Sequence, residues 1–204
     1  NLRKNFNLEN NTYQTSWSEI DVSCEACHGP ASKHIELAKS LNNSEFRNLP
    51  DKGLAIRFPI AGNDKWSFPK NSSIAKLQSL RSSIKLIDTC ARCHSRRSSL
   101  NSSKPYLGSL HDNYLVSSLD QGLYHADGQM NDETYVYGSF IQSKMYRAGV
   151  NCIDCHNAHS LELLEKGNAL CLQCHKQTKF DTESHHFHPA DTAAAQCVSC
   201  HMPA

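Results

Sequence analysis

Ten cysteines and five histidines of this sequence repeat one pattern. The cysteines fall into five C-x-x-C pairs, and a histidine directly follows every pair. This is the attachment pattern of c-type haem, in which the two thiols bind the haem vinyl groups and the adjacent imidazole binds the iron. The sequence therefore predicts five covalently attached haems. Their thiols belong to Cys24, Cys27, Cys90, Cys93, Cys152, Cys155, Cys171, Cys174, Cys197 and Cys200, and their proximal ligands are His28, His94, His156, His175 and His201.

Three other uses of paired cysteines explain the pattern less well. A Cys₄ zinc site takes two pairs, so five pairs leave one over, and zinc gives no reason for the five histidines. A disulfide scaffold would not repeat a single spacing five times. A thioredoxin-like redox site uses one C-x-x-C on a βαβ frame, and no such alternation is seen here.

Seven further histidines could supply the second axial ligand of the irons. Five are needed if every haem is bis-histidine, and methionine is the main competing ligand. Of the three methionines, Met130 stays open as an alternative sixth ligand. Met202 directly follows a proximal histidine and cannot easily reach round its own haem, and Met145 has the helical spacing of a core residue. Crowding at positions 185–188 leaves room for at most two ligands there. The candidate distal histidines are His34, His111, His125, His159, His185, His186 and His188.

His159 lies only three residues after the proximal His156. Two axial ligands approach an iron from opposite faces, each nitrogen about 2 Å from the metal, so their Cα atoms lie roughly 12–13 Å apart. Three extended residues reach at most about 11 Å. His159 is therefore expected to serve a neighbouring haem.

Composition agrees with a protein that contains large prosthetic groups. Dividing 204 residues among five haems leaves about 41 residues for each. The hydrophobic content of 39% is low, so the macrocycles are expected to supply much of the buried apolar surface. The net charge of +1 gives no support to a nucleic-acid partner, and no apolar run approaches the ~20 residues of a membrane span.

Haem attachment of this type is completed outside the cytoplasmic membrane, so a periplasmic or extracellular location is expected. The polar first residues do not read as a signal peptide, so the chain is expected to be a mature form or a fragment.

The intervals between motifs divide the chain into a sparse part, residues 1–130 with two haems, and a dense part, residues 131–204 with three. The two parts are expected to form one continuous haem domain. The fold class expected is mainly α with much irregular structure, wrapped around closely packed haems. Apolar periodicity and turn residues predict helices at 32–41, 73–94, 138–147 and 160–175, a loop at 45–70 and a weak strand at 133–137.

Most of the chain resembles multihaem cytochromes c that are often joined to tetratricopeptide repeats. These belong to the wider group that contains hydroxylamine oxidoreductase and its tetrahaem acceptor cytochrome. One departure is Gly29-Pro30-Ala31, where relatives have Gly-Pro-Gly. The likeness is carried by SCEACHGPASKH, CARCHSRR, GLYHADGQ, YVYGSFIQSKMYRAGVNCIDCHNAHS, NALCLQCH, SHHFH and QCVSCHMP.

Together, the motifs and the resemblance predict electron transfer along a chain of bis-histidine haems, with no catalytic residue. The partners expected are redox proteins or further copies of the chain, stacked haem to haem as a subunit of an extracellular conductive filament. The alternative is a reductase or oxidase of small nitrogen or sulfur compounds, which would need one haem with an open coordination position.

Overall fold

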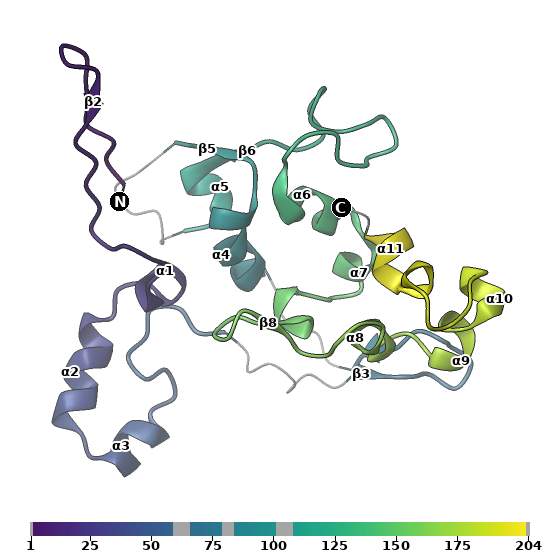
Figure 1. Ribbon diagram of the computed structural model, residues 1–204. Coiled ribbons are helices and arrows are strands. Elements are labelled where there is room, and N and C mark those ends of the chain that lie inside the picture. The colour runs from purple at the N-terminus through teal and green to yellow at the C-terminus, as the bar shows by residue number, and fades with distance from the viewer. Residues whose placement is uncertain (1, 59–65, 79–83, 101–107, 203–204) are drawn as a thin grey trace. The chain divides into compact units, whose positions relative to one another are not determined.

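The fold is taken from a computed structural model, which describes residues 2–58, 66–78, 84–100 and 108–202 (Figure 1). The chain divides into two compact units. Unit 1 comprises Asn1–Phe58 with Lys104–Gly108, and unit 2 comprises Pro59–Ser103 with Ser109–Ala204. The two units are defined by which residues contact one another. The division at residue 130 was made differently, from how closely the motifs follow one another in sequence, and it stays a prediction.

Unit 1 contains a two-stranded antiparallel hairpin and three short helices. The strands are β1 (Phe6–Asn7) and β2 (Thr12–Tyr13), and the rings of Phe6 and Tyr13 lie 4.8 Å apart across them. The helices are α1 (Cys24–His28), α2 (Ser32–Ser40) and α3 (Asn43–Asn48). Asn42 and Glu45 form a capping box that starts α3, so the local sequence fixes where this helix begins.

Unit 2 contains the other four motifs on short helices joined by turns and three small sheets. Its strand pairs are β3 (Trp66–Ser67) with β4 (Lys76–Leu77), β5 (Arg97–Ser99) with β6 (Tyr114–Val116), and β7 (His156–Asn157) with β8 (Glu162–Leu163), all antiparallel. Its helices are α4 (Ile84–His94), α5 (Leu110–Asn113), α6 (Tyr135–Gln142), α7 (Lys144–Arg147), η1 (Cys152–Asp154), α8 (Ala169–Leu172), α9 (Gln177–Phe180), α10 (Glu183–His186), η2 (Ala193–Ala195) and α11 (Cys197–His201).

The buried apolar residues of unit 2 centre on α4. This helix packs against α5, α6 and η1, and it contributes Leu86, Ile87 and Ala91 to the interior. Leu110 on α5 is fully buried against this group and Ile153 on η1 is 7% exposed. Many large apolar side chains elsewhere in the described parts stay exposed. Side chains alone therefore bury little apolar surface, as the composition predicts.

The structure is partly helical with much irregular chain, which confirms that part of the predicted fold class. The predicted helix at 32–41 is α2, and the predicted helix at 138–147 is present as α6 and α7, separated at Ser143. None of the helices in the described ranges is long and apolar enough to cross a bilayer.

Four local predictions need correction. In the range 73–94 only α4 is helical, because residues 76–77 pair with β3 instead, and residues 79–83 lie outside the described chain. In the range 160–175, the predicted helix is present only as α8, because residues 162–163 form strand β8 instead. The weak strand at 133–137 is wrong, since α6 begins at Tyr135. The loop at 45–70 contains the end of α3 and also β3, and its residues 59–65 are not described.

Candidate functional site

Each C-x-x-C-H unit lies on or beside a single helical turn. The first unit is α1, the second is the last turn of α4, and the fifth is α11. The fourth begins in α8, and its proximal His175 continues the turn by donating its backbone N–H to the carbonyl oxygen of Cys171 at 3.0 Å. Residues three and four apart share one face of a helix, so in these units both thiols and the imidazole are presented together. The third unit differs, because η1 ends at Asp154 and His156 opens strand β7.

The ten thiols are present as free cysteines, and none is joined in a disulfide. Within the described ranges, no three His, Cys, Asp or Glu side chains gather as a group that could hold one metal ion. Along the sequence, each motif still provides two thiols and one imidazole, which is the donor set that covalent haem attachment uses.

Thiols of different motifs also meet inside unit 2. The Cys90 thiol hydrogen-bonds to Cys152, and this contact is the main cause that lowers the pKa of Cys152. The Cys197 thiol hydrogen-bonds to Cys171, and burial followed by this neighbour raises the pKa of Cys197 to about 11. The first cysteine of motif two thus lies against the first cysteine of motif three, and the same holds for motifs four and five.

In unit 1, two histidines are oriented by backbone carbonyl groups of the segment that follows α3. His28 Nδ1 lies 3.0 Å from the Ile56 carbonyl oxygen, and His34 Nδ1 lies 2.8 Å from that of Lys52. A carbonyl oxygen only accepts, so both imidazoles carry their proton on Nδ1 and the lone pair on Nε2. Metal-binding histidines are commonly oriented in this way. His34, a predicted distal ligand, is therefore in the tautomer that iron ligation through Nε2 requires.

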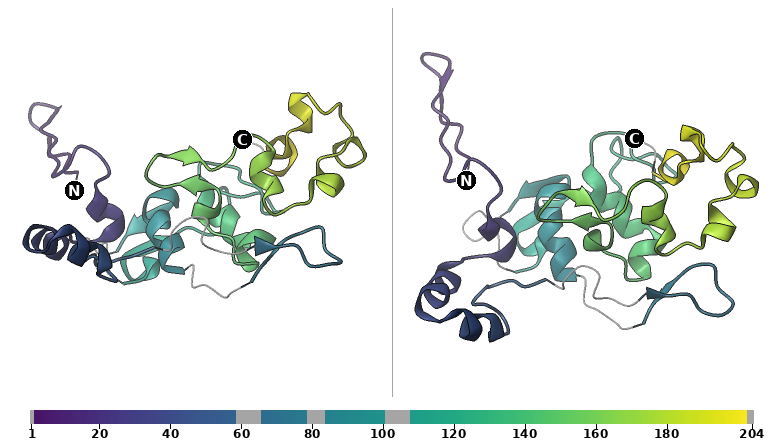
Figure 2. Two further views of the ribbon diagram at one scale, coloured as in Figure 1. Left: turned by 90° about the horizontal axis from the view of Figure 1, so that it is seen from below. Right: turned by 60° about the horizontal axis from the view of Figure 1, so that its bottom comes forward.

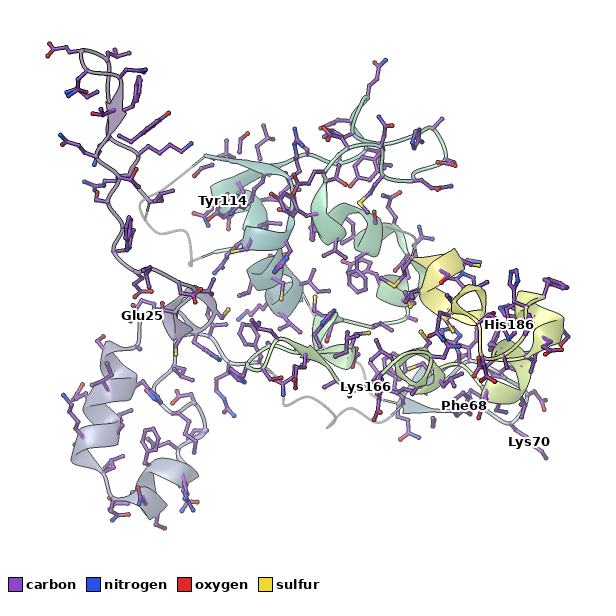
Figure 3. The ribbon with its side chains drawn as sticks, in the orientation of Figure 1. Glu25, Phe68, Lys70, Tyr114, Lys166 and His186 are labelled. Atoms are coloured by element: carbon purple, nitrogen blue, oxygen red, sulfur yellow. The ribbon has the colours of Figure 1, made fainter. Side chains whose placement is uncertain are left out.

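Two contacts hold this arrangement in place. The Glu25 carboxylate on α1 accepts the backbone N–H of Ala31 at 2.7 Å, which connects α1 to the start of α2 (Figure 3). Gly53 has a φ of 72°, and a β-carbon there would lie 2.8 Å from Leu37 Cδ1 and 3.0 Å from the His34 backbone nitrogen. The segment after α3 can approach His34 this closely because residue 53 has no side chain.

A group of aromatic rings connects motifs four and five at one end of unit 2, where α9, α10 and α11 lie together (Figure 2). The ring centroids of His185 and His201 are 6.2 Å apart, and their planes differ by 12°. Phe180 lies 5.2 Å from His175 and 5.5 Å from His185, with its ring at 90° to each. Burial, and then the charge of His201, lower the pKa of His175, which favours the neutral imidazole that binds metal.

Asn168 joins the same two motifs through its side-chain amide. Its Nδ2 donates to Asp181 Oδ1 at 2.8 Å and to the Ala195 carbonyl oxygen at 3.1 Å. Its Oδ1 accepts the backbone N–H of Cys197 at 2.8 Å. Since Asn168 directly precedes α8 and Cys197 begins α11, one side chain sets the spacing between motifs four and five.

Most of the other predicted ligands lie at the surface, and His185 and His201 are exposed as well. His94, His111, His125, His156, His159 and His188 are exposed. His186, labelled in Figure 3, is half-buried, and its Nδ1 accepts the backbone N–H of His188 at 3.3 Å. Which iron each of these histidines binds stays a prediction.

Two positions of this site were not singled out from the sequence. Phe180 and Asn168 stand in segments without a distinguishing motif, and their partners are 5–29 residues away. Gly53 lies within the segment 45–70 that was predicted as a loop. Its positive φ could have been suspected from the type of residue, but its contact with His34 could not.

Comparison with protein families identifies part of this chain. Residues 144–180, which include motifs three and four, match the family described as the doubled CXXCH motif. Neither a curated protein nor a solved structure matches the chain. Paired motifs of this kind indicate covalently bound haem c. Over this segment the chain is thus similar to proteins with doubled haem-attachment motifs, which indicates a multihaem c-type cytochrome.

Proposed function

We propose that this chain binds five haem c groups and transfers electrons along them. The observation that carries the proposal is the contact of thiols between motifs, Cys90 with Cys152 and Cys171 with Cys197. Each thiol is an attachment point for a vinyl group at the edge of a macrocycle. Haems attached to neighbouring thiols have their edges close together, which electron transfer between them needs.

The chain's own residues would hold the haems and complete the iron coordination. We propose His201 and His185 as the two axial ligands of the fifth haem. With each nitrogen about 2 Å from the metal, the ring centroids of two opposed imidazoles lie roughly 6 Å apart. The observed 6.2 Å between these two stacked, nearly parallel rings is compatible with that separation. The group itself, when bound, supplies an iron that accepts and releases one electron.

Orientation of the ligands in unit 1 supports the same function. The carbonyl oxygens of Ile56 and Lys52 hold His28 and His34 in the tautomer that ligates through Nε2. The remaining distal ligands would come from His111, His125, His159, His186 and His188. The likeness to tetratricopeptide-associated cytochromes supports an electron-transfer role within that wider group, in a periplasmic or extracellular location.

Two measurements on the haem-containing protein test the proposal. Pyridine haemochrome analysis should give five haems per chain, and a value well below five would contradict it. Visible and electron paramagnetic resonance (EPR) spectra should show low-spin iron throughout. The alternative function, a reductase or oxidase with one open haem, predicts that cyanide or nitrite shifts the Soret band, whereas the electron-transfer proposal predicts no shift.

The exposed last motif suggests the surface used for partners. On α11, Cys200 and His201 are exposed, and so is the neighbouring Met202 at 60%. We propose that the haem attached here meets a redox partner or the haem of a further copy, as in a conducting filament. Electron microscopy of the purified protein tests the filament. Particles of uniform size at high protein concentration would exclude self-assembly and leave the redox partner.

A further inference from the structure

One aromatic side chain lies between the histidine of motif four and a histidine from the segment that joins motifs four and five. Phe180, the last residue of α9, presents its ring at 90° to both His175 and His185, with centroid distances of 5.2 and 5.5 Å. These are edge-to-face contacts, an arrangement that aromatic rings favour. The ring of His185 in turn lies nearly parallel to that of His201. Phe180 therefore contacts two histidine rings, and one of these lies nearly parallel to a third.

The backbone around Phe180 is fixed on both sides of the ring. Its own N–H donates to the Lys176 carbonyl oxygen at 3.0 Å, and the Lys176 N–H donates to that of Ser73 at 2.9 Å. On the other side, the His185 N–H donates to the Thr182 carbonyl oxygen at 2.8 Å. Phenylalanine has only two side-chain torsions, so a fixed backbone leaves its ring few orientations. Phe180 is thus a rigid support for the imidazoles that touch it.

We infer that Phe180 is a positioning residue that sets the plane of the His185 imidazole relative to that of His201. The inference rests on the proposed function, in which these two histidines bind one iron. Because Phe180 also contacts His175, the proximal ligand of the fourth haem, one ring orients ligands of two successive haems. A single side chain, Phe180, would then influence the orientation of an axial imidazole at each of the two irons.

This role has a spectroscopic consequence. The angle between the planes of two axial imidazoles determines how the iron d orbitals split. Nearly parallel planes give a rhombic low-spin EPR signal, and planes turned toward a right angle give a much more anisotropic one. The 12° between His185 and His201 predicts a rhombic signal for this haem.

The test compares three variants of the haem-containing protein. Phe180→Leu keeps apolar volume but loses the ring, so we expect one rhombic signal to broaden or move toward the more anisotropic form. Phe180→Tyr keeps the ring and should restore the wild-type spectrum. Phe187→Leu is the matched control, because Phe187 is 82% exposed two residues after His185, and it should change nothing. An unchanged EPR spectrum in Phe180→Leu overturns the inference.

A second pair of variants separates this inference from the proposed function. His185→Ala should convert one haem to high spin, and added imidazole should return it to low spin. Ser184→Ala, at the exposed position before His185, is the control and should leave every haem low-spin. If His185→Ala leaves every haem low-spin, the ligand assignment in the proposed function is wrong. If it produces the high-spin haem while Phe180→Leu matches the wild type, only the role of Phe180 is wrong.

Discussion

Replacing Asn168 by alanine should loosen the connection between motifs four and five. The amide of Asn168 makes hydrogen bonds to Asp181, Ala195 and Cys197, at 2.8, 3.1 and 2.8 Å respectively. Alanine removes all three. The backbone N–H of Cys197, at the start of α11, then loses the acceptor that the structure gives it.

The size of the effect follows from the type of bond. A hydrogen bond between neutral groups contributes about 0.5–1.5 kcal/mol, and one to a charged group such as the Asp181 carboxylate about 1.5–3 kcal/mol. Asn168 is half-buried, so water replaces part of what is lost. We therefore expect the free energy of unfolding to fall by roughly 2–3 kcal/mol. For a chain of this size the midpoint of thermal unfolding should fall by about 5–10 °C.

The assay is thermal unfolding of the haem-containing protein, followed by far-ultraviolet circular dichroism. Gln173→Ala is the matched control, since it removes a single hydrogen bond from an exposed side chain to the Leu170 carbonyl oxygen. Asn168→Asp keeps an oxygen that can accept the Cys197 N–H, but it loses the Nδ2 donor and places a second carboxylate beside Asp181. This variant should therefore lower the free energy of unfolding as much as Asn168→Ala does. A melting midpoint for Asn168→Ala within one or two degrees of the Gln173→Ala control would refute the reasoning.

Two other predictions concern stability. Gly53→Ala should lower the unfolding free energy by about 1 kcal/mol more than Gly122→Ala, because both positions have positive φ but only at Gly53 would the new methyl group press on Leu37 and the His34 backbone. Equal losses in denaturant titrations would show that the close approach is unimportant. Burial, Asp88 and Tyr146 raise the pKa of Tyr137 above the ordinary 10.0, so its contribution to stability is complete below pH 10.0 and is lost as the pH rises through the higher folded-state value. Tyr137→Phe should reduce the loss of stability between pH 9 and pH 11, and an identical loss in the variant would contradict this.

Short-range pattern explains the local form of the motifs, and helix was expected from the sequence at the second and fourth. Two thiols and an imidazole at positions one, four and five need only one helical turn to share a face, and four of the five motifs have that turn. The helix that carries His34 was predicted at 32–41, and α2 begins at Ser32, two residues after Pro30. Both features depend on neighbours within about ten residues.

Long-range pairing explains the helix that was predicted wrongly. Ile74 and Leu77 have helical spacing, but the segment 73–76 is extended and bonds to motif four. Ala75 donates its N–H to the Cys174 carbonyl oxygen at 2.8 Å, and Ile74 forms a bridge with His175. These partners are about a hundred residues away in sequence. Periodicity counts only nearby positions, so it could not show that this segment supports a haem-attachment turn.

The reach of the chain limits which histidine can face which iron, but it does not choose among those that remain. His159 is expected not to bind the iron of its own motif, because three residues are too short to pass around a porphyrin. His185 is sixteen residues before His201, a length that permits a shared iron without requiring one. Two short helices, α9 and α10, bring the His185 ring to 6.2 Å from that of His201. Spacing therefore predicts which histidines are too close in sequence to share an iron, and the course of the backbone between motifs brings together the pair that we propose as ligands.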